Sequence, residues 1–263
     1  MRVSWIVTTG MALLLTGCGA MQTLPTPEER QALTPAGKLR GAFLANQPIH
    51  ATKDSASGEL KGVAIELGSE LARRLQVSFE PVIYPTAVAL LGSAKSGDWD
   101  IIFTGIVPDR MKDMDFSAPY LQIEMGFLVR GDSPLLRAAD VDKPGVRIAV
   151  LQRGSSDVIL TSTLKAATLI RNPTVADAVD LLRTGKADAV GALKTFLYPS
   201  SAKVPGSRVL EGGYGYEVIG IGVPKGRELS ARYVRKFVDD AKSSGLVKAA
   251  VDRAAQRGLM AAP

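Results

Sequence analysis

The chain has 263 residues, of which 46% are hydrophobic and 22% are charged, and its formal net charge is +6. This length allows one large domain or two smaller lobes, and the composition is that of a folded chain. One Cys and one His are too few for a zinc cage, a disulfide framework or a Cys–His nucleophile pair, so we predict no metal and no cofactor. The 32 basic residues form no Lys/Arg run, which argues against a nucleic-acid partner.

The N-terminus has the pattern of a secretory signal. Arg2 supplies a positive charge, and an apolar stretch from Trp5 to Leu15 follows, well short of the roughly 20 residues of a spanning helix. The stretch ends in Leu15-Thr16-Gly17-Cys18, which resembles a bacterial lipobox. The resemblance implies a signal peptide over residues 1–17 and a lipid anchor on Cys18. The alternative is an ordinary cleaved signal with a chance Cys. Residues 18–35, rich in Pro and Thr, are expected to be a tether.

Strand-like and helix-like segments alternate in the next part of the chain. Apolar residues at Ala64, Leu67, Leu71 and Leu75 have the spacing of one helical face. The predicted elements are a strand over 38–44, a helix over 63–75, a strand over 77–83, a helix over 86–95 and a strand over 100–104. Strands separated by helices of this length favour an α/β fold with a parallel sheet.

The same alternation recurs further along. Thr174, with Asp177 three residues later, has the pattern of a capping box, and Gly185 is expected to end that helix. The other predicted elements are strands over 146–151, 167–171 and 188–191, a helix over 155–165, a β-like stretch over 217–223 and helices over 229–243 and 246–256. We therefore expect the chain to end as a helix.

Four motifs follow one another within about 35 residues. They are Asp100-Ile-Ile-Phe-Thr-Gly, Pro108-Asp109-Arg110, Asp115-Phe-Ser-Ala-Pro-Tyr and Val129-Arg-Gly-Asp-Ser-Pro. In this order and spacing they resemble the type II periplasmic solute-binding proteins of ABC importers, in the polar amino-acid family. Further similarity at Gly154-Ser155-Ser156 and 185–190 extends the resemblance over nearly all of the chain from Gly37 to Gly258.

This resemblance implies two α/β lobes joined by two hinge crossings, which close on a ligand. Lobe I is expected to hold residues 36–128 plus 225–263, and lobe II residues 129–224. The implied protein is a monomer in the periplasm or cell envelope. Its implied partners are a small solute, an ABC permease in the inner membrane and, through the lipid anchor, the membrane itself.

Arg110 matches the family Arg that holds the ligand carboxylate. A guanidinium suits this role because it is always charged and its planar fork pairs with two carboxylate oxygens. The chain between Gly105 and Arg110 is about two residues shorter than the family pattern, so the loop is expected to be tighter. An exposed loop Arg is the structural alternative.

Two further segments are candidate ligand contacts. Ser155 and Ser156 lie where a strand ends and a helix begins, a position whose free backbone N–H groups favour an anion. A plain N-cap is the alternative. Thr104 and Gly105 end a strand at the edge where open α/β sheets bind ligands, although Thr104 is equally acceptable as a buried strand residue.

Leu193 departs from the family pattern. Amino-acid binders of the family usually carry at this position an Asp that pairs with the ligand's ammonium group. Because a buried ammonium without a partner is costly, the site must find another acid or bind a solute without that amine. Glu124 is our candidate substitute and Glu217 a weaker one, with a surface Glu as the alternative for Glu124. Lys194 is either a second cation of the site or a solvated Lys.

The remaining candidates rest on position alone. Asn46 and Tyr84 are expected at the cleft wall, although a turn residue and a core aromatic are equal alternatives. His50, the single His, is expected at the surface, and Trp99 is expected to pack structurally.

Three functions compete. The leading hypothesis is a binding protein, not an enzyme, that captures a small carboxylate-bearing solute, an amino acid or related organic acid. The first alternative is a cyclohexadienyl or arogenate dehydratase-like enzyme on the same scaffold, in which Glu124 transfers a proton. The second is a ligand sensor that presents its closed state to a membrane receptor.

Overall fold

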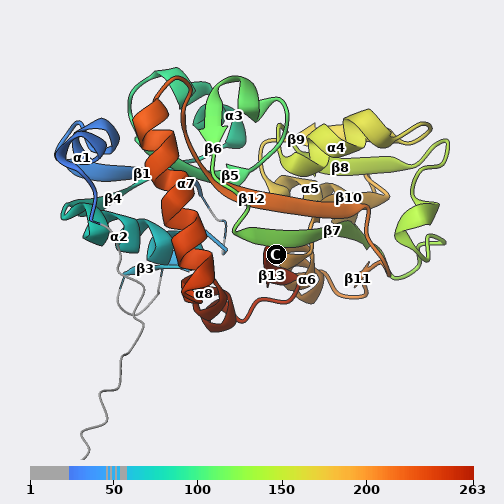
Figure 1. Ribbon diagram of the computed structural model, residues 1–263. Coiled ribbons are helices and arrows are strands. Elements are labelled where there is room, and N and C mark those ends of the chain that lie inside the picture. The colour runs from blue at the N-terminus through green and yellow to red at the C-terminus, as the bar shows by residue number, and fades with distance from the viewer. Residues whose placement is uncertain (1–23, 46, 48, 51, 54–57) are drawn as a thin grey trace, which may run out of the picture.

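The computed structural model describes residues 24–45, 47, 49–50, 52–53 and 58–263 (Figure 1). Eleven strands of this part of the chain form one large sheet, in the order β4-β1-β5-β12-β7-β10-β8-β9 with β6, β11 and β13 paired at its sides. A two-stranded ribbon, β2 (Thr52–Lys53) with β3 (Leu60–Lys61), stands apart from it. None of the helices among these residues is both long and apolar enough to cross a bilayer.

The first half of the sheet is built on three parallel strands. They are β1 (Lys38–Leu44), β4 (Ser78–Tyr84) and β5 (Ile101–Gly105), and β1 lies between the other two. The antiparallel strand β12 (Gly215–Pro224) pairs with β5 and closes this half. All five residues of β5 are buried, as its short apolar run predicts.

The second half repeats that arrangement. Its parallel strands are β8 (Arg147–Leu151), β9 (Thr168–Asn172) and β10 (Ala189–Leu193), with β8 in the middle. Here the antiparallel strand beside β10 is β7 (Leu121–Val129). Each half therefore combines three parallel strands with one strand that arrives from the other half.

The two long strands β7 and β12 connect the halves. Residues 121–125 of β7 pair with 215–219 of β12, and the far ends of both strands pair within opposite halves. The chain crosses between the halves in these two strands (Figure 1).

Helices cover the faces of the sheet. In contact with the first half are α2 (Val63–Leu75) and α3 (Ala87–Gly92), and with the second half α4 (Ser155–Thr163), α5 (Val175–Arg183) and α6 (Lys194–Lys203). The remaining elements are α1 (Pro27–Leu33), α7 (Glu228–Ser243), α8 (Leu246–Ala254), β6 (Met114–Phe116), β11 (Arg208–Val209), β13 (Leu259–Ala261) and the 3-10 helices η1 (Ser93–Lys95), η2 (Arg110–Lys112) and η3 (Ala138–Asp140).

The buried apolar side chains form several clusters, and the largest one extends from the first half to Leu193 of the second. It includes Phe43, Phe103 and Phe237, so helix α7 packs with the first half. Two other clusters, around Phe127 and Leu128, contain only side chains from residues 127–214. Trp99 is 1% exposed and donates through Nε1 to Ser93 Oγ at 2.9 Å, which confirms its structural packing.

Most predicted elements are confirmed, including the capping box of Thr174 and Asp177 on α5. Two expectations are wrong. Residues 27–33, expected in a tether, form α1, which packs on α7 and buries Leu33 because Thr26 and Glu29 close a capping box with Pro27 in the first turn. The chain ends in β13, not in a helix, because 259–261 pair with residues 121–123 at the start of β7.

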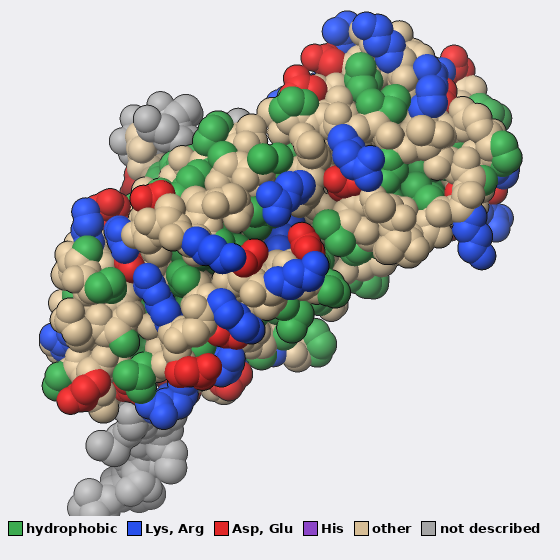
Figure 2. Space-filling view, turned by 90° about the horizontal axis from the view of Figure 1, so that it is seen from above, with side chains coloured by type: hydrophobic (Ala, Val, Ile, Leu, Met, Phe, Trp, Pro, Cys, Tyr) green, Lys and Arg blue, Asp and Glu red, His purple; other side chains and the backbone are tan. Residues whose placement is uncertain are grey.

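Seen from above, the molecule is elongated, and acidic side chains lie among the Lys and Arg side chains of this face (Figure 2). Some charged side chains of the protein form ion pairs between exposed groups, for example Lys112 with Asp109 and Arg183 with Asp180. Such pairs contribute little to stability, about 0–1 kcal/mol each.

Candidate functional site

A narrow cavity of about 60 Å³ lies between the two halves of the sheet. The carboxyl ends of the parallel strands β1, β5, β8 and β10 all reach it, as expected for a ligand site of an α/β sheet. Most of its wall is apolar. The polar side chains of its described lining belong to Gln47, His50, Thr104, Arg110, Ser155, Ser156 and Glu217.

Arg110 is buried in the cavity wall, with 7% of its surface exposed. Its Nη1 donates to Thr104 Oγ1 at 3.0 Å and to the carbonyl oxygen of Gly105 at 2.9 Å. Its Nη2 donates to the carbonyl oxygen of Arg153, in the second half, at 3.2 Å. The short loop after Gly105 therefore brings Arg110 back to the end of its own strand, and the exposed-Arg alternative is excluded.

The Arg110 guanidinium has capacity left for a ligand. A guanidinium carries five N–H groups, and three of them are used in the bonds just described. Within the part of the chain that the structure describes, Nε has no partner although it is buried. A buried N–H without an acceptor is costly, so this group is available to donate to an anion or a water molecule.

Helix α4 presents an uncapped N-terminus to the cavity. The N-cap residue is Gly154, without a side-chain cap, so the alternative of a plain N-cap is excluded for Ser155 and Ser156. The Ser155 hydroxyl donates to Glu217 Oε1 instead, and Tyr214 donates its hydroxyl to Ser156 Oγ at 2.7 Å. The first-turn backbone N–H groups of α4 have no acceptor within the helix and favour an anion.

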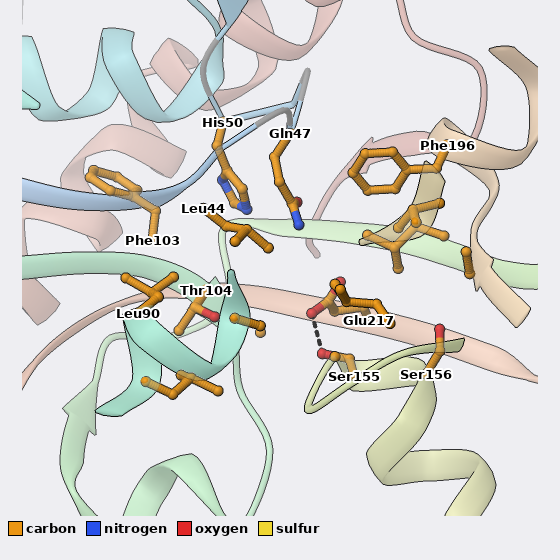
Figure 3. Close-up of a pocket in the computed structure, with 18 of the residues that line it drawn as sticks. Leu44, Gln47, His50, Leu90, Phe103, Thr104, Ser155, Ser156, Phe196 and Glu217 are labelled. Carbon is orange, nitrogen blue, oxygen red and sulfur yellow. Dashed lines mark hydrogen bonds between the residues drawn. The ribbon is translucent and has the colours of Figure 1, made fainter. Parts of the chain in front are cut away.

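Glu217, near the start of β12, is the acid of the cavity. Its Oε1 accepts from Ser155 Oγ (Figure 3). The same oxygen lies 3.7 Å from Arg110 Nη1. Burial raises the pKa of this carboxyl, while the charge of Arg110 and the hydrogen bond from Ser155 oppose the rise. Gly105 makes the arrangement possible, because a Cβ there would overlap Glu217 Oε1 and crowd Arg110 Nη1 and Ser155 Oγ.

His50 and Gln47 reach the cavity from the segment after β1, and both point toward Glu217 (Figure 3). His50 is 4% exposed, so the expectation of a surface His is wrong. Burial, reinforced by the charge of Arg110, lowers the pKa of His50 to about 4. The imidazole is therefore neutral near pH 7, and its buried Nδ1 has no partner among the described residues.

Two predicted site residues lie elsewhere. Glu124 does not line the cavity, because its Oε1 accepts from Lys194 Nζ at 2.6 Å. Lys194 does not line the cavity and is itself buried, so it is neither a second cation of the cavity nor a solvated side chain. Tyr84, at the end of β4, packs against the cluster around Trp99 and does not line the cavity.

The remaining sequence candidates divide as follows. Thr104, Gly105, Arg110, Ser155 and Ser156 come together in the lining. Leu193 also lines the cavity and places an apolar group there. Asn46 and Cys18 lie outside the described residues. No group of three or more His, Cys, Asp or Glu side chains that could hold a metal ion occurs in the described part of the chain.

Glu217 and His50 are more central to the cavity than their sequence patterns indicate. Glu217 stands among the apolar residues of 218–223, and an isolated acid within such a strand was the available signal. His50 had no comparable signal, because its burial depends on contacts between α2 and the segment after β1, where Ile65 N donates to the His50 carbonyl oxygen.

Two α/β halves joined by two crossing strands, with a cavity between them, define a solute-binding protein. Residues 41–255 match the model of the bacterial extracellular solute-binding proteins, family 3, and the chain belongs to this family. Its architecture is that of type II periplasmic binding proteins. Members of the family are located in the periplasm or cell envelope.

Individual relatives bind amino acids. The glutamine-binding protein of Geobacillus stearothermophilus is 24% identical over 245 residues, which cover 84% of this chain and 92% of that protein. A mutant of ArgBP from T. maritima is 25% identical with a TM-score of 0.74, over 86% of this chain and 98% of that chain. An ancestral amino acid-binding protein, described as a precursor of cyclohexadienyl dehydratase, is 25% identical with a TM-score of 0.72, over 85% and 98%.

Proposed function

We propose that this protein is the solute-capturing component of an ABC importer, which takes a small carboxylate-bearing solute and delivers it to a permease in the inner membrane. One observation carries the proposal: the unpaired Nε of Arg110 and the uncapped N-terminus of α4 belong to the lining of the same cavity from opposite halves. Both groups favour a carboxylate. The glutamine- and arginine-binding relatives support an amino acid or a related acid.

Capture requires the halves to separate. A cavity of about 60 Å³ has room for only a few water molecules. We infer that the structure is a closed form and that a solute enters when lobe I, residues 36–128 plus 225–263, swings away from lobe II, residues 129–224. The strands β7 and β12 would form the hinge, because they are the crossings between the two sets of parallel strands.

A dehydratase-like activity is the second candidate. It is favoured by the buried carboxyl of Glu217, whose raised pKa suits a general acid, beside an Arg that binds carboxylates. Glu217, not Glu124, would transfer the proton. The similarity to a precursor of cyclohexadienyl dehydratase supports testing it.

A lipid anchor on Cys18 is part of the proposal. The Cys18→Ala variant should be released from membranes that retain the wild-type chain, because one or more acyl chains would supply the anchor. Partition of the expressed protein between aqueous and detergent phases measures this. Thr16→Ser, which keeps the Cys, is the control, and equal partition of wild type and Cys18→Ala would contradict the anchor.

A thermal-shift screen with Arg110→Ala as the test variant decides the function. At 100 times Kd, a solute should add about 2.7 kcal/mol of stability to residues 19–263, which raises Tm by several degrees. We expect the hits to carry carboxylates and to be lost in Arg110→Ala. Arg73→Ala, which removes an exposed Arg paired with Glu70, should bind as wild type does.

Each variant in this screen is compared with its own ligand-free Tm. Hits that survive in Arg110→Ala, or the absence of any carboxylate hit, would refute the proposed site. Turnover of prephenate-like acids by the wild type would then favour the dehydratase.

A further inference from the structure

The charges of the cavity are balanced before any solute enters when Glu217 is ionised. Its described lining contains one carboxylate, that of Glu217, and one guanidinium, that of Arg110. Both side chains are at least nine-tenths buried, and His50 adds no charge near pH 7 because its pKa is about 4. Since a buried net charge is costly, the charge that a solute brings decides how well this cavity holds it.

Glu217 has one oxygen free for a solute. Oε1 accepts from Ser155, whereas Oε2 accepts no hydrogen bond from any described residue. The carboxylate lies between Ser155 and the ends of His50 and Gln47, inside the cavity (Figure 3). It can therefore accept a hydrogen bond from a charged donor and keep the hydrogen bond from Ser155.

No other described lining residue can balance a cationic group. Leu193 places an apolar side chain in the wall, and Glu124 lies outside the cavity in its pair with Lys194. A solute with a carboxylate alone would leave one uncompensated negative charge beside Glu217. A solute with a carboxylate, an amine and no further charge would leave the cavity neutral.

We propose that Glu217 binds the cationic amine of the solute while Arg110 and the first turn of α4 bind its carboxylate, so that the site selects neutral zwitterions against amine-free acids. This inference rests on the proposed function and names the class of solute. Glu217 is thus a specificity-determining residue on the strand β12. It does not occupy the position of Leu193, where amino-acid binders of the family usually carry the Asp that pairs with the ammonium group.

Matched pairs of solutes that differ only in the amine test the inference. The probes are L-glutamine with 4-carbamoylbutanoate, and L-leucine with 4-methylpentanoate, and their Kd values are measured by calorimetry. For at least one pair, wild type should bind the amino member roughly 10- to 150-fold more tightly, the range for a hydrogen bond to a charged group. In Glu217→Gln this preference should disappear. Glu124→Gln, which neutralises an acid outside the cavity, should keep it.

A measurement on the wild type alone covers the case in which Glu217→Gln does not fold. Binding of an amine-free acid should be coupled to uptake of about one proton, because protonation of Glu217 restores neutrality. Binding of the amino member should take up none. Titration in two buffers of different ionisation enthalpy measures this. The other groups facing the pair are Arg153, Asp109, His50, Tyr120 and Tyr214. Burial raises the pKa of both tyrosines, so they stay neutral, and the hydrogen bond from Lys112 lowers the pKa of Asp109, so it stays charged.

The outcomes separate this inference from the proposed function. Equal affinity for both members of the tightest pair, or an amine preference that survives in Glu217→Gln, would overturn the role of Glu217 while leaving solute capture intact. If an amine-free acid binds tightly and no proton is taken up, the role of Glu217 is likewise overturned. If no probe and no other small carboxylate binds in an Arg110-dependent manner, the proposed function fails and this inference fails with it.

Discussion

Replacing Arg110 by Met should lower the free energy of unfolding by about 3–5 kcal/mol, the usual cost of leaving one buried charge without its partner. The uncompensated group would be Glu217, which lies 3.7 Å from Arg110 Nη1. Loss of the bonds to Thr104, Gly105 and Arg153 adds to the effect. Urea unfolding at pH 7 measures it, with the slope m checked for a change in the denatured state.

Removal of both charges should be less harmful than removal of one. The double variant Arg110→Met with Glu217→Leu should be more stable than Arg110→Met, because buried pairs replaced by apolar groups lose little. Arg183→Met, which breaks an exposed pair with Asp180, should change stability by no more than about 0.5 kcal/mol. A double variant less stable than Arg110→Met would show that the two charges are not coupled as the geometry implies.

Acid should destabilise the protein through His50. The pKa of this His is about 4 in the folded chain and about 6.5 when unfolded, so between these values the unfolded chain binds more protons. The contribution of neutral His50 to the free energy of unfolding is therefore complete above pH 6.5 and is lost as the pH falls toward 4. With each pKa unit worth 1.36 kcal/mol, the loss approaches about 3 kcal/mol.

The difference between wild type and His50→Gln isolates this contribution. Glu217 works in the opposite direction over part of the range, since an acid with a raised pKa stabilises the fold as the pH falls. Because His50 is the single His of the chain, no other imidazole contributes. Unfolding free energies measured every half unit from pH 4 to 7.5 give the difference. Parallel pH profiles for wild type and His50→Gln would contradict the prediction.

Local patterns were sufficient for most of the secondary structure. The face of Ala64, Leu67, Leu71 and Leu75 predicts α2 with its observed bounds, because helix periodicity depends only on residues a few positions apart. The strand β7 and the helix α6 were not predicted. Both are defined by partners distant in the chain: β7 pairs with β12, β10, β11 and β13, and α6 packs on β7 and β10.

The binding site divides in the same way. Thr104, Gly105, Arg110, Ser155 and Ser156 were found because each stands in a motif next to a strand end or a helix start. The sequence could not decide which of the two acids, Glu124 or Glu217, lines the cavity. Their roles depend on which acid meets Lys194 and which meets Arg110, at sequence separations of 70 and 107 residues.

The sequence by itself determined the α/β class, the family resemblance and the cation of the site, since these depend on local periodicity and on short motifs. The tertiary structure alone decided which acid faces that cation, that His50 is buried and neutral, and that 27–33 and 259–261 join the fold. Burial and ion pairing between distant segments decide such questions, because the charge state of a side chain depends on its surroundings in space.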